Sequence, residues 1–379
     1  MMEKIRAFLL KEAVLVVAAL AAVMSCILVP FDKGYASYVD WRTLALLFCL
    51  MAVVTGLRFM GAMRLLGSWA VSRASSVRAL AFALVALTFV SSMAVTNDVA
   101  LITFAPLALV VLAEAGESRF TASVVVLMTV SANLGSMLLP VGNPQNLFLY
   151  RVSGMDFFQF VLIMVPVVVV SAAMLVAAVL VVFRGNAGGL SNRTSRKALP
   201  KPTGRQGLMF VSYLILFVLS VMAVVGIIDA FAVAALVAFA LLFLDRRSLA
   251  KVDYGLLFTF VALFVFVGNM ARVPAVHEAL SALVGISPFC AVVGSSQVIS
   301  NVPAAVLLSG FTNNWTALIV GTNLGGLGTP IASMASLISL KIATASGLVG
   351  KRHYLAVFTA WNVAFLAVLC AANAVFGWA

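Results

Sequence analysis

Long apolar runs separated by short polar loops make up most of this chain, and the pattern predicts membrane-spanning helices. About 20 apolar residues are enough to cross the hydrocarbon core of a bilayer as a helix. Uninterrupted runs occupy residues 13–30, 43–57, 157–183, 207–226, 230–244, 254–270 and 354–378. Two further stretches, residues 58–78 and 273–284, are interrupted by charges or are short and amphipathic, which is typical of helices lying at the membrane surface.

One apolar run, residues 121–150, contains a stretch that does not fit a continuous helix. From Ser131 to Leu147 it carries two glycines, two prolines and three asparagines. Proline removes a backbone donor and breaks the helical ladder. A membrane helix tolerates such a break only where the freed backbone groups face protein, water or a bound solute. The run at 315–340 has the same character from Gly321 to Leu337, so the sequence predicts two broken helices that form a binding site.

Two other apolar runs have polar centres. Residues 79–113 contain Ser91–Asp98, and residues 286–312 contain Ser295–Asn301. A polar centre in an apolar run predicts two half-helices that meet at a tip inside the membrane, a re-entrant hairpin. For residues 79–113 a single kinked crossing is the alternative.

The hairpins and the broken helices form an internal repeat. Ser91-Ser92 followed by Thr96-Asn97 matches Ser295-Ser296 followed by Ser300-Asn301, at the same spacing. The broken helices share a second pattern, Asn-Leu-Gly with a proline seven residues after the asparagine. It occurs as Asn133 to Pro140 and as Asn323 to Pro330.

Five predicted crossings separate the two hairpins, so the second hairpin enters from the opposite face of the membrane. The fold class is therefore an all-α polytopic membrane protein with two inverted repeats and about nine full spans. Inverted repeats with discontinuous helices that meet at the midplane are typical of secondary transporters. Half-helix N-termini bind anions, and unwound carbonyls with neutral Asn or Ser side chains bind small cations.

Composition supports the membrane class. The chain has 379 residues, 64% of them hydrophobic and 9% charged, whereas soluble domains carry about 25% charged residues. The net charge of +12 arises from basic residues in short loops, which favours a positive-inside arrangement over binding to nucleic acid. The four cysteines and two histidines have no metal-like spacing, and we expect no cofactor other than bound sodium ions.

The loop charges predict the orientation. With the N-terminus in the cytoplasm and each hairpin returning to its own side, 20 of the 24 Lys and Arg residues lie inside. The basic linker at 184–206 then connects the halves in the cytoplasm. A retained N-terminal helix, rather than a cleaved signal peptide, places the protein in the cell (inner or plasma) membrane. The remaining four basic residues face outward: Lys33, Arg42, Arg151 and Arg272.

These motifs resemble the ion transporter superfamily, which includes divalent anion/sodium symporters, citrate permeases, arsenite permeases and NhaD-type antiporters. The resemblance rests on the hairpin tips and on Pro140–Asn146, and it covers nearly the whole chain. It implies a homodimer in which a transport domain slides past a scaffold, the elevator mechanism. Residues 1–78 and 207–285 would form the scaffold, and residues 79–183 and 286–379 would form the transport domain.

The resemblance also implies where a small ionic substrate and the coupling ion bind. The candidate sodium sites are Asn97 with Asn133, and Asn301 with Asn323. The full set of candidate binding residues is Thr96, Asn97, Asp98, Asn133, Gly135, Asn143, Ser300, Asn301, Asn323, Gly325 and Thr329.

The match departs from the symporters at both tips. Asp98 and Val302 stand where the symporters have hydroxyl residues, which puts dicarboxylate recognition in doubt. Asp98 is the only acid expected deep in the membrane, where a carboxylate costs about 2.5–3.5 kcal/mol on insertion scales. It is either an N-cap for the second arm of the hairpin or the group that binds sodium or a proton.

The sequence therefore predicts a secondary active transporter that moves a di- or tricarboxylate or an inorganic oxyanion with sodium or protons. The alternatives within transport are arsenite or antimonite efflux and sodium/proton exchange. A passive channel is a further alternative. An enzyme is not expected, because no nucleophile–base pair or ligand cluster lies at membrane depth.

Overall fold

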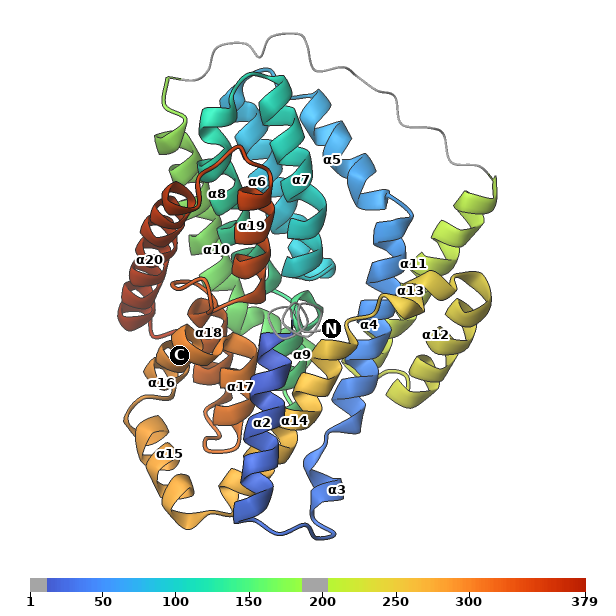
Figure 1. Ribbon diagram of the computed structural model, residues 1–379, viewed down its shortest axis with the longest axis vertical. Helices are drawn as coiled ribbons and strands as arrows, with labels where there is room; N and C mark the ends of the chain where they lie inside the picture. The colour runs from blue at the N-terminus through green and yellow to red at the C-terminus, as the bar shows by residue number, and fades with distance from the viewer. Residues whose placement is uncertain (1–11, 186–203) are drawn as a thin grey trace, which may run out of the picture.

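The structure, a computed structural model, describes residues 12–185 and 204–379, and within these ranges it is helical with no β-strand (Figure 1). Most of the predicted linker at 184–206 and the basic N-terminal start lie outside the described residues. The helices of the first half are α2 (Ala13–Leu28), α3 (Tyr35–Tyr38), α4 (Trp41–Phe59), α5 (Ala62–Ser72), α6 (Val77–Ala94), α7 (Asn97–Glu114), α8 (Thr121–Ser136), α9 (Pro144–Ser153) and α10 (Phe157–Val182). Those of the second half are α11 (Gly204–Val225), α12 (Ala230–Leu244), α13 (Arg246–Ala250), α14 (Tyr254–Ala271), α15 (Pro274–Ile286), α16 (Pro288–Ile299), α17 (Asn301–Ser309), α18 (Trp315–Gly325), α19 (Met334–Ala345) and α20 (Lys351–Phe376).

Acids in the loops fix where several helices begin. Asp40, Asp229 and Asp253 accept hydrogen bonds from the first free N–H groups of α4, α12 and α14. Asp156 forms a reciprocal capping box with Gln159 at the start of α10. Capping of this kind satisfies donors that a helix leaves unpaired. Several of the acids in the chain therefore lie in loops, where they cap helices.

Element order is duplicated along the chain. Each half has a helix pair, α6–α7 or α16–α17, followed by a broken helix, α8–α9 or α18–α19, and then a helix of 26 residues, α10 or α20. A shorter amphipathic helix, α5 or α15, precedes each pair. These elements lie where the sequence predicts the hairpins, the broken helices and the surface helices.

The number of spans differs from the nine predicted. Within the described residues, seven helices are long and apolar enough to cross a membrane, or eight if the bent pair α15–α16 counts as one. Both arms α6 and α7 pass this test separately, since each has 18 residues. The predicted spans at α2 and α12 have 16 and 15 residues and fall short of it. The polytopic membrane class is thus confirmed. The apolar runs differ from the prediction in which of them are long enough to span the membrane.

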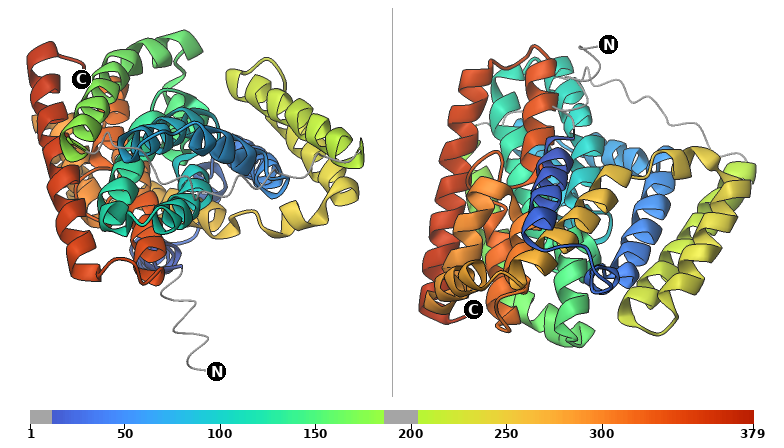
Figure 2. Two further views of the ribbon diagram at one scale, coloured as in Figure 1. Left: turned by 90° about the horizontal axis from the view of Figure 1, so that it is seen from above. Right: turned by 60° about the horizontal axis from the view of Figure 1, so that its bottom comes forward.

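The helices form two groups. Helices α4, α11 and α12 pack together on the right of Figure 1, and α6–α8 with α16–α20 form a larger bundle on the left, a separation that Figure 2 also shows. Helices α2 and α14 pack closely against each other between them. The two breaks lie within the larger bundle.

Glycines bring the helix pairs against the broken helices. A side chain at Gly135 of α8 would overlap the Phe89 carbonyl and come within 2.5 Å of Ser92 Oγ on α6. At the matching place in the second half, a Cβ on Gly325 of α18 would lie 2.6 Å from Ser296 Oγ on α16. Close approach of this kind needs residues without a side chain, as at other membrane helix interfaces.

Both helix pairs turn at a strained residue. Thr96 (φ 63°) and Ser300 (φ 74°) are the two non-glycine residues with positive φ among those the structure describes. Such a conformation costs on the order of 1–3 kcal/mol and persists only where the surroundings enforce it. The tips predicted from the repeat therefore share an unusual backbone geometry.

Replacing Gly135 by alanine tests this packing. We expect Gly135→Ala to lower the free energy of unfolding by about 1–3 kcal/mol, because the added methyl group must push α6 away from α8. Thermal unfolding in detergent measures the effect. Gly294→Ala is the matched control, since Gly294 is also helical but has open space around it. Equal stability of both variants would contradict the packing.

Candidate functional site

The two broken helices meet inside the larger bundle. In the first, α8 ends at Ser136 and α9 begins at Pro144, with a single 3₁₀ turn at Pro140–Gly142 between them. In the second, α18 ends at Gly325 and α19 begins at Met334. Helix α9 packs against α17 and α18, and α8 packs against α19. Segments nearly 200 residues apart thus share one region.

Reciprocal hydrogen bonds join the breaks. Asn143, which precedes α9, donates from Nδ2 to Oδ1 of Asn323 on α18 at 3.1 Å. Ser333, which precedes α19, donates from Oγ to Oδ1 of Asn133 on α8 at 2.9 Å. The residue before the second half-helix of each half therefore bonds the asparagine in the first half-helix of the other half.

The network extends to the first helix pair. Asn97, the first residue of α7, donates to Asn133 Oδ1 at 3.1 Å, and Asn133 Nδ2 lies 3.4 Å from the Gly326 carbonyl. Asn323 donates to Asn146 Oδ1 at 2.6 Å and to the Ile319 carbonyl. All the asparagines in this network are at least nine-tenths buried. Neutral amides satisfy the freed backbone without placing a charge in the bilayer.

Asn146 closes the first break from inside its own half. Its Nδ2 lies within 3.4 Å of the carbonyls of Ser136, Met137 and Leu139, and its N–H donates to Asn143 Oδ1. Carbonyls freed by the prolines thereby find a donor. Asn146 is completely buried, and its hydrogen bonds stabilise the backbone of the first break.

Polar side chains at both tips lack a hydrogen-bond partner among the described residues. Asp98 Oδ1 is buried and unpaired, and the side-chain amide of Asn301, a residue that is 4% exposed, makes no hydrogen bond, although its backbone N–H bonds the Ala332 carbonyl. The capping alternative for Asp98 is wrong, because α7 begins at Asn97 and Thr96 occupies the N-cap position. Asp98 lies in the first turn instead, and its N–H donates to Asn97 Oδ1. Buried unpaired polar groups are costly, which makes these two candidates for contact with a bound solute.

The structure brings together most of the predicted site residues. Asn97, Asn133, Asn143 and Asn323 lie in one network, and Gly135 and Gly325 lie at the helix contacts beside it. Ser300 and Asn301 bond the Ala332 carbonyl in the second break. Thr96 has no side-chain hydrogen bond, and Thr329 lies apart, exposed and bonded to Gln297.

Two residues of the network were missed from the sequence. Ser333 stands ten residues after Asn323, as Asn143 stands ten residues after Asn133, so extending the repeat past the prolines would have identified it. Gln297 makes several bonds to the second break, but the first half has Met93 at that place. No repeat pattern could have indicated a residue present in one half alone.

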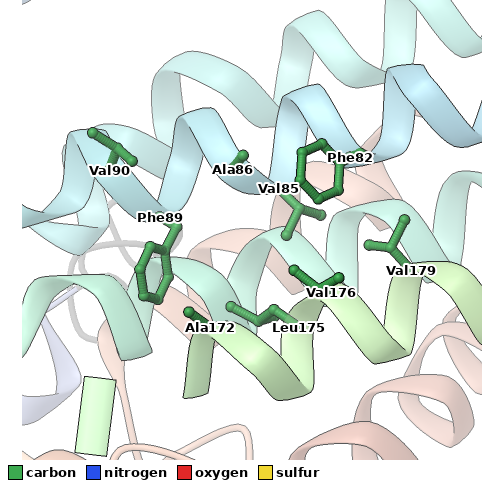
Figure 3. A pocket seen from close by; sticks show the side chains of 9 residues that line it. All are labelled: Phe82, Val85, Ala86, Phe89, Val90, Ala172, Leu175, Val176 and Val179. Atoms are coloured by element: carbon green, nitrogen blue, oxygen red, sulfur yellow. The ribbon is translucent and has the colours of Figure 1, made fainter. Parts of the chain in front are cut away.

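The cavity between α6 and α10 does not suit an ionic solute. Its volume is about 100 Å³, and Figure 3 shows that side chains of Phe, Val, Leu and Ala line it, with no polar group among them. Phe82, Val90 and Val176 in its wall are more than one third exposed, as expected of a lipid-facing groove. The polar junction of the breaks is the better candidate site.

Duplicated helix pairs, paired breaks and a buried neutral amide network define a membrane transporter rather than a soluble binding protein. Comparison with known families agrees. Residues 1–314 match the citrate transporter family model, and the chain belongs to this family.

Relatives cover most of the chain. An uncharacterized transporter of Methanocaldococcus jannaschii is 30% identical over 320 residues, which are 83% of this chain and 84% of the relative. The inner membrane protein YbiR of Escherichia coli is 31% identical over 321 residues, 83% of each chain. A silicon efflux transporter of Oryza sativa is 34% identical over 152 residues, 39% of this chain and 30% of the relative.

The bond between Asn143 and Asn323 can be tested by a double-mutant cycle. We expect Asn143→Ala and Asn323→Ala each to lower the free energy of unfolding by about 1–3 kcal/mol, because each leaves a buried amide unpaired. The coupling energy should be about 0.5–3 kcal/mol. Reversible unfolding in mixed micelles measures it, and Asn143→Ala with Asn362→Ala is the control pair. Asn362 bonds the Phe358 carbonyl on its own helix, so the control effects should add, and additivity of the first pair would refute the bond.

Proposed function

We propose that this protein is a secondary active transporter whose solute and coupling ion bind at the junction of the two breaks. The observation that carries the proposal is the reciprocal amide network, which joins both halves and leaves the Asp98 carboxylate unpaired beside it. Membership in the citrate transporter family supports transport of a small anion, a di- or tricarboxylate or an inorganic oxyanion.

The two tips suit different solutes. At the first tip, the Asp98 carboxylate and the oxygens of Asn97 and Asn133 suit sodium or a proton, since oxygen ligands and negative charge favour small cations. At the second tip, α17 begins without a side-chain cap. The Asn301 N–H bonds the Ala332 carbonyl and position 303 is proline, so the donors left there are the Val302 N–H and the Asn301 side-chain amide. A helix N-terminus with free N–H groups favours an anion. Cation and anion would thus bind on opposite sides of the amide network.

Inverted repeats and an elevator movement form the second part of the proposal. Between the helix pairs lie the broken helix α8–α9 and helices α10, α11, α12 and α14. If α12 crosses the membrane despite its 15 residues, these elements make five crossings, which would place the second pair in the opposite orientation. Reciprocal bonds between equivalent residues are what a twofold relation between the halves would produce. The group α4, α11 and α12 is a candidate scaffold in a homodimer, with the N-terminus in the cytoplasm.

Efflux of an uncharged metalloid acid, such as arsenous or silicic acid, is the second candidate. It is favoured by one observation: the side chains that the described network joins include neither Lys nor Arg, and Asp98 is an acid. A dianion near an unpaired carboxylate would be repelled, whereas a neutral hydroxyl compound would not. The relative named as a silicon efflux transporter adds support. Sodium/proton exchange would need only the Asp98 tip.

A thermal-shift screen tests the proposal and separates these candidates. Purified protein is heated with citrate, succinate, sulfate, phosphate, arsenite or silicic acid, each with and without sodium. A solute that binds only the native state raises stability, by about 2.7 kcal/mol at 100 times its Kd. Stabilisation by an anion supports the first candidate, and stabilisation by arsenite or silicic acid supports the second. Stabilisation by none of them, together with no flux in proteoliposomes, would overturn solute transport.

Asp98→Asn tests the coupling ion. We expect the variant to fold but to lose coupled flux at least tenfold, because loss of a charged contact costs about 1.5–3 kcal/mol. Proteoliposome assays measure labelled citrate counterflow and collapse of an imposed pH gradient. Glu117→Gln, which alters an exposed ion pair with Arg119, is the control and should behave as wild type. Unchanged ion dependence in Asp98→Asn would exclude Asp98 as the coupling group.

A further inference from the structure

The two helix pairs are held to their breaks in different ways, although the repeat makes them equivalent. In the second half, Gln297 of α16 donates from Nε2 to the carbonyls of Gly325 and Leu327 at 2.9 and 3.0 Å. Its Oε1 accepts from the Thr329 N–H at 2.9 Å, and its backbone carbonyl accepts from the Thr329 hydroxyl at 2.9 Å. One side chain therefore binds both sides of the bend.

Glycine makes room for this contact. Gly328 has φ of +100°, and a Cβ at this position would overlap Gln297 Oε1. The backbone of the bend therefore approaches the carboxamide as closely as a residue without a side chain allows. The tip residues add two bonds, from Asn301 N–H at 2.9 Å and Ser300 Oγ at 3.3 Å, both to the Ala332 carbonyl.

The first half has none of these bonds. Met93 stands at the position equivalent to Gln297, and a thioether cannot donate a hydrogen bond. Across residues 93–98 and 137–143, all of which the structure describes, no hydrogen bond joins the tip to the break. The tip is held to α8 through Asn97 and Asn133, while Asn146 closes the break from its own side.

We propose that Gln297 is a positioning residue that locks the α16–α17 tip to the second break, and that the unlocked α6–α7 tip is the part of the site that opens. Local opening is least costly where few hydrogen bonds must break. The lock keeps Asn301 and Gly326 in place while residues 95–98 move with Asp98. The opening of one tip rests on the proposed transport function, whereas the lock itself does not.

Hydrogen–deuterium exchange in nanodiscs measures the lock directly, without any solute. In the wild-type protein, peptides covering residues 93–99 should exchange at least about tenfold faster than peptides covering 297–303. Gln297→Met, which copies the first half, should raise exchange at 297–303 by a similar factor and leave 93–99 unchanged. Gln297→Glu keeps the acceptor for Thr329 but loses both donors, so its effect should be intermediate.

Thr329→Val removes the hydrogen bond from the Thr329 hydroxyl to the Gln297 carbonyl at an exposed position. This variant can be measured even if Gln297→Met does not fold. It should raise exchange at 297–303 only slightly and leave exchange at 93–99 unchanged. Equal exchange at the two wild-type tips, or no change at 297–303 in both Gln297→Glu and Thr329→Val, would overturn the lock.

Transport kinetics separate a positioning role from a merely structural one. With labelled citrate and, separately, arsenite in proteoliposomes, Gln297→Met should raise KM at least about tenfold and change kcat much less, because a loosened site binds solute more weakly. A fall in the amount of folded protein alone would leave KM unchanged and overturn the positioning role. If neither compound is transported but the exchange pattern holds, the proposed function fails and the lock stands.

Discussion

Two interrupted helices inside a bilayer create a need for hydrogen bonds that water cannot meet, and the rest of the structure depends on how that need is met. The prolines free carbonyls in the first break, and the donors are mainly amides: Asn146 from the same half, with Asn143 and Asn323 linking the halves. Because Asn143 bonds the second half and Ser333 bonds the first, neither break is complete without the other. Each half therefore needs the other to satisfy its buried polar groups in the bilayer.

The proposed function rests on what the network leaves unsatisfied. Amides and hydroxyls keep the junction neutral, so the unpaired Asp98 carboxyl is the group that a coupling ion would contact there. At the other tip, the Asn301 side-chain amide and the Val302 N–H at the uncapped start of α17 are the remaining donors. A transporter gains from such incomplete satisfaction, because a solute that supplies the missing bonds stabilises one conformation over another. The hydrogen bonds of Gln297 occur at the second tip alone, and in our proposal this difference makes the first tip the part that moves.

Much of the fold could be predicted because hydrophobic periodicity and repeat patterns report local structure. Helices α6 and α7 meet at Thr96, and α16 and α17 meet at Ser300, where the polar centres of the apolar runs predict tips. The number of spans could not be predicted, because a helix such as α2 with 16 residues and an arm such as α6 with 18 have similar apolar runs. The hydrogen bonds between the two halves could not be predicted either, because nothing in the sequence indicates that Ser333 contacts Asn133. Gln297 was missed because it breaks the repeat, and Thr329, selected from the resemblance, lies exposed beside it.

Binding of solute where the two breaks meet can be seen by electron cryo-microscopy of the protein in nanodiscs, with the solute that most raises its thermal stability. We expect density for the solute in contact with the Asn301 amide, with a coupling ion beside Asp98 and Asn133. A solute bound elsewhere, with the asparagine network intact and both tips unoccupied, would contradict it.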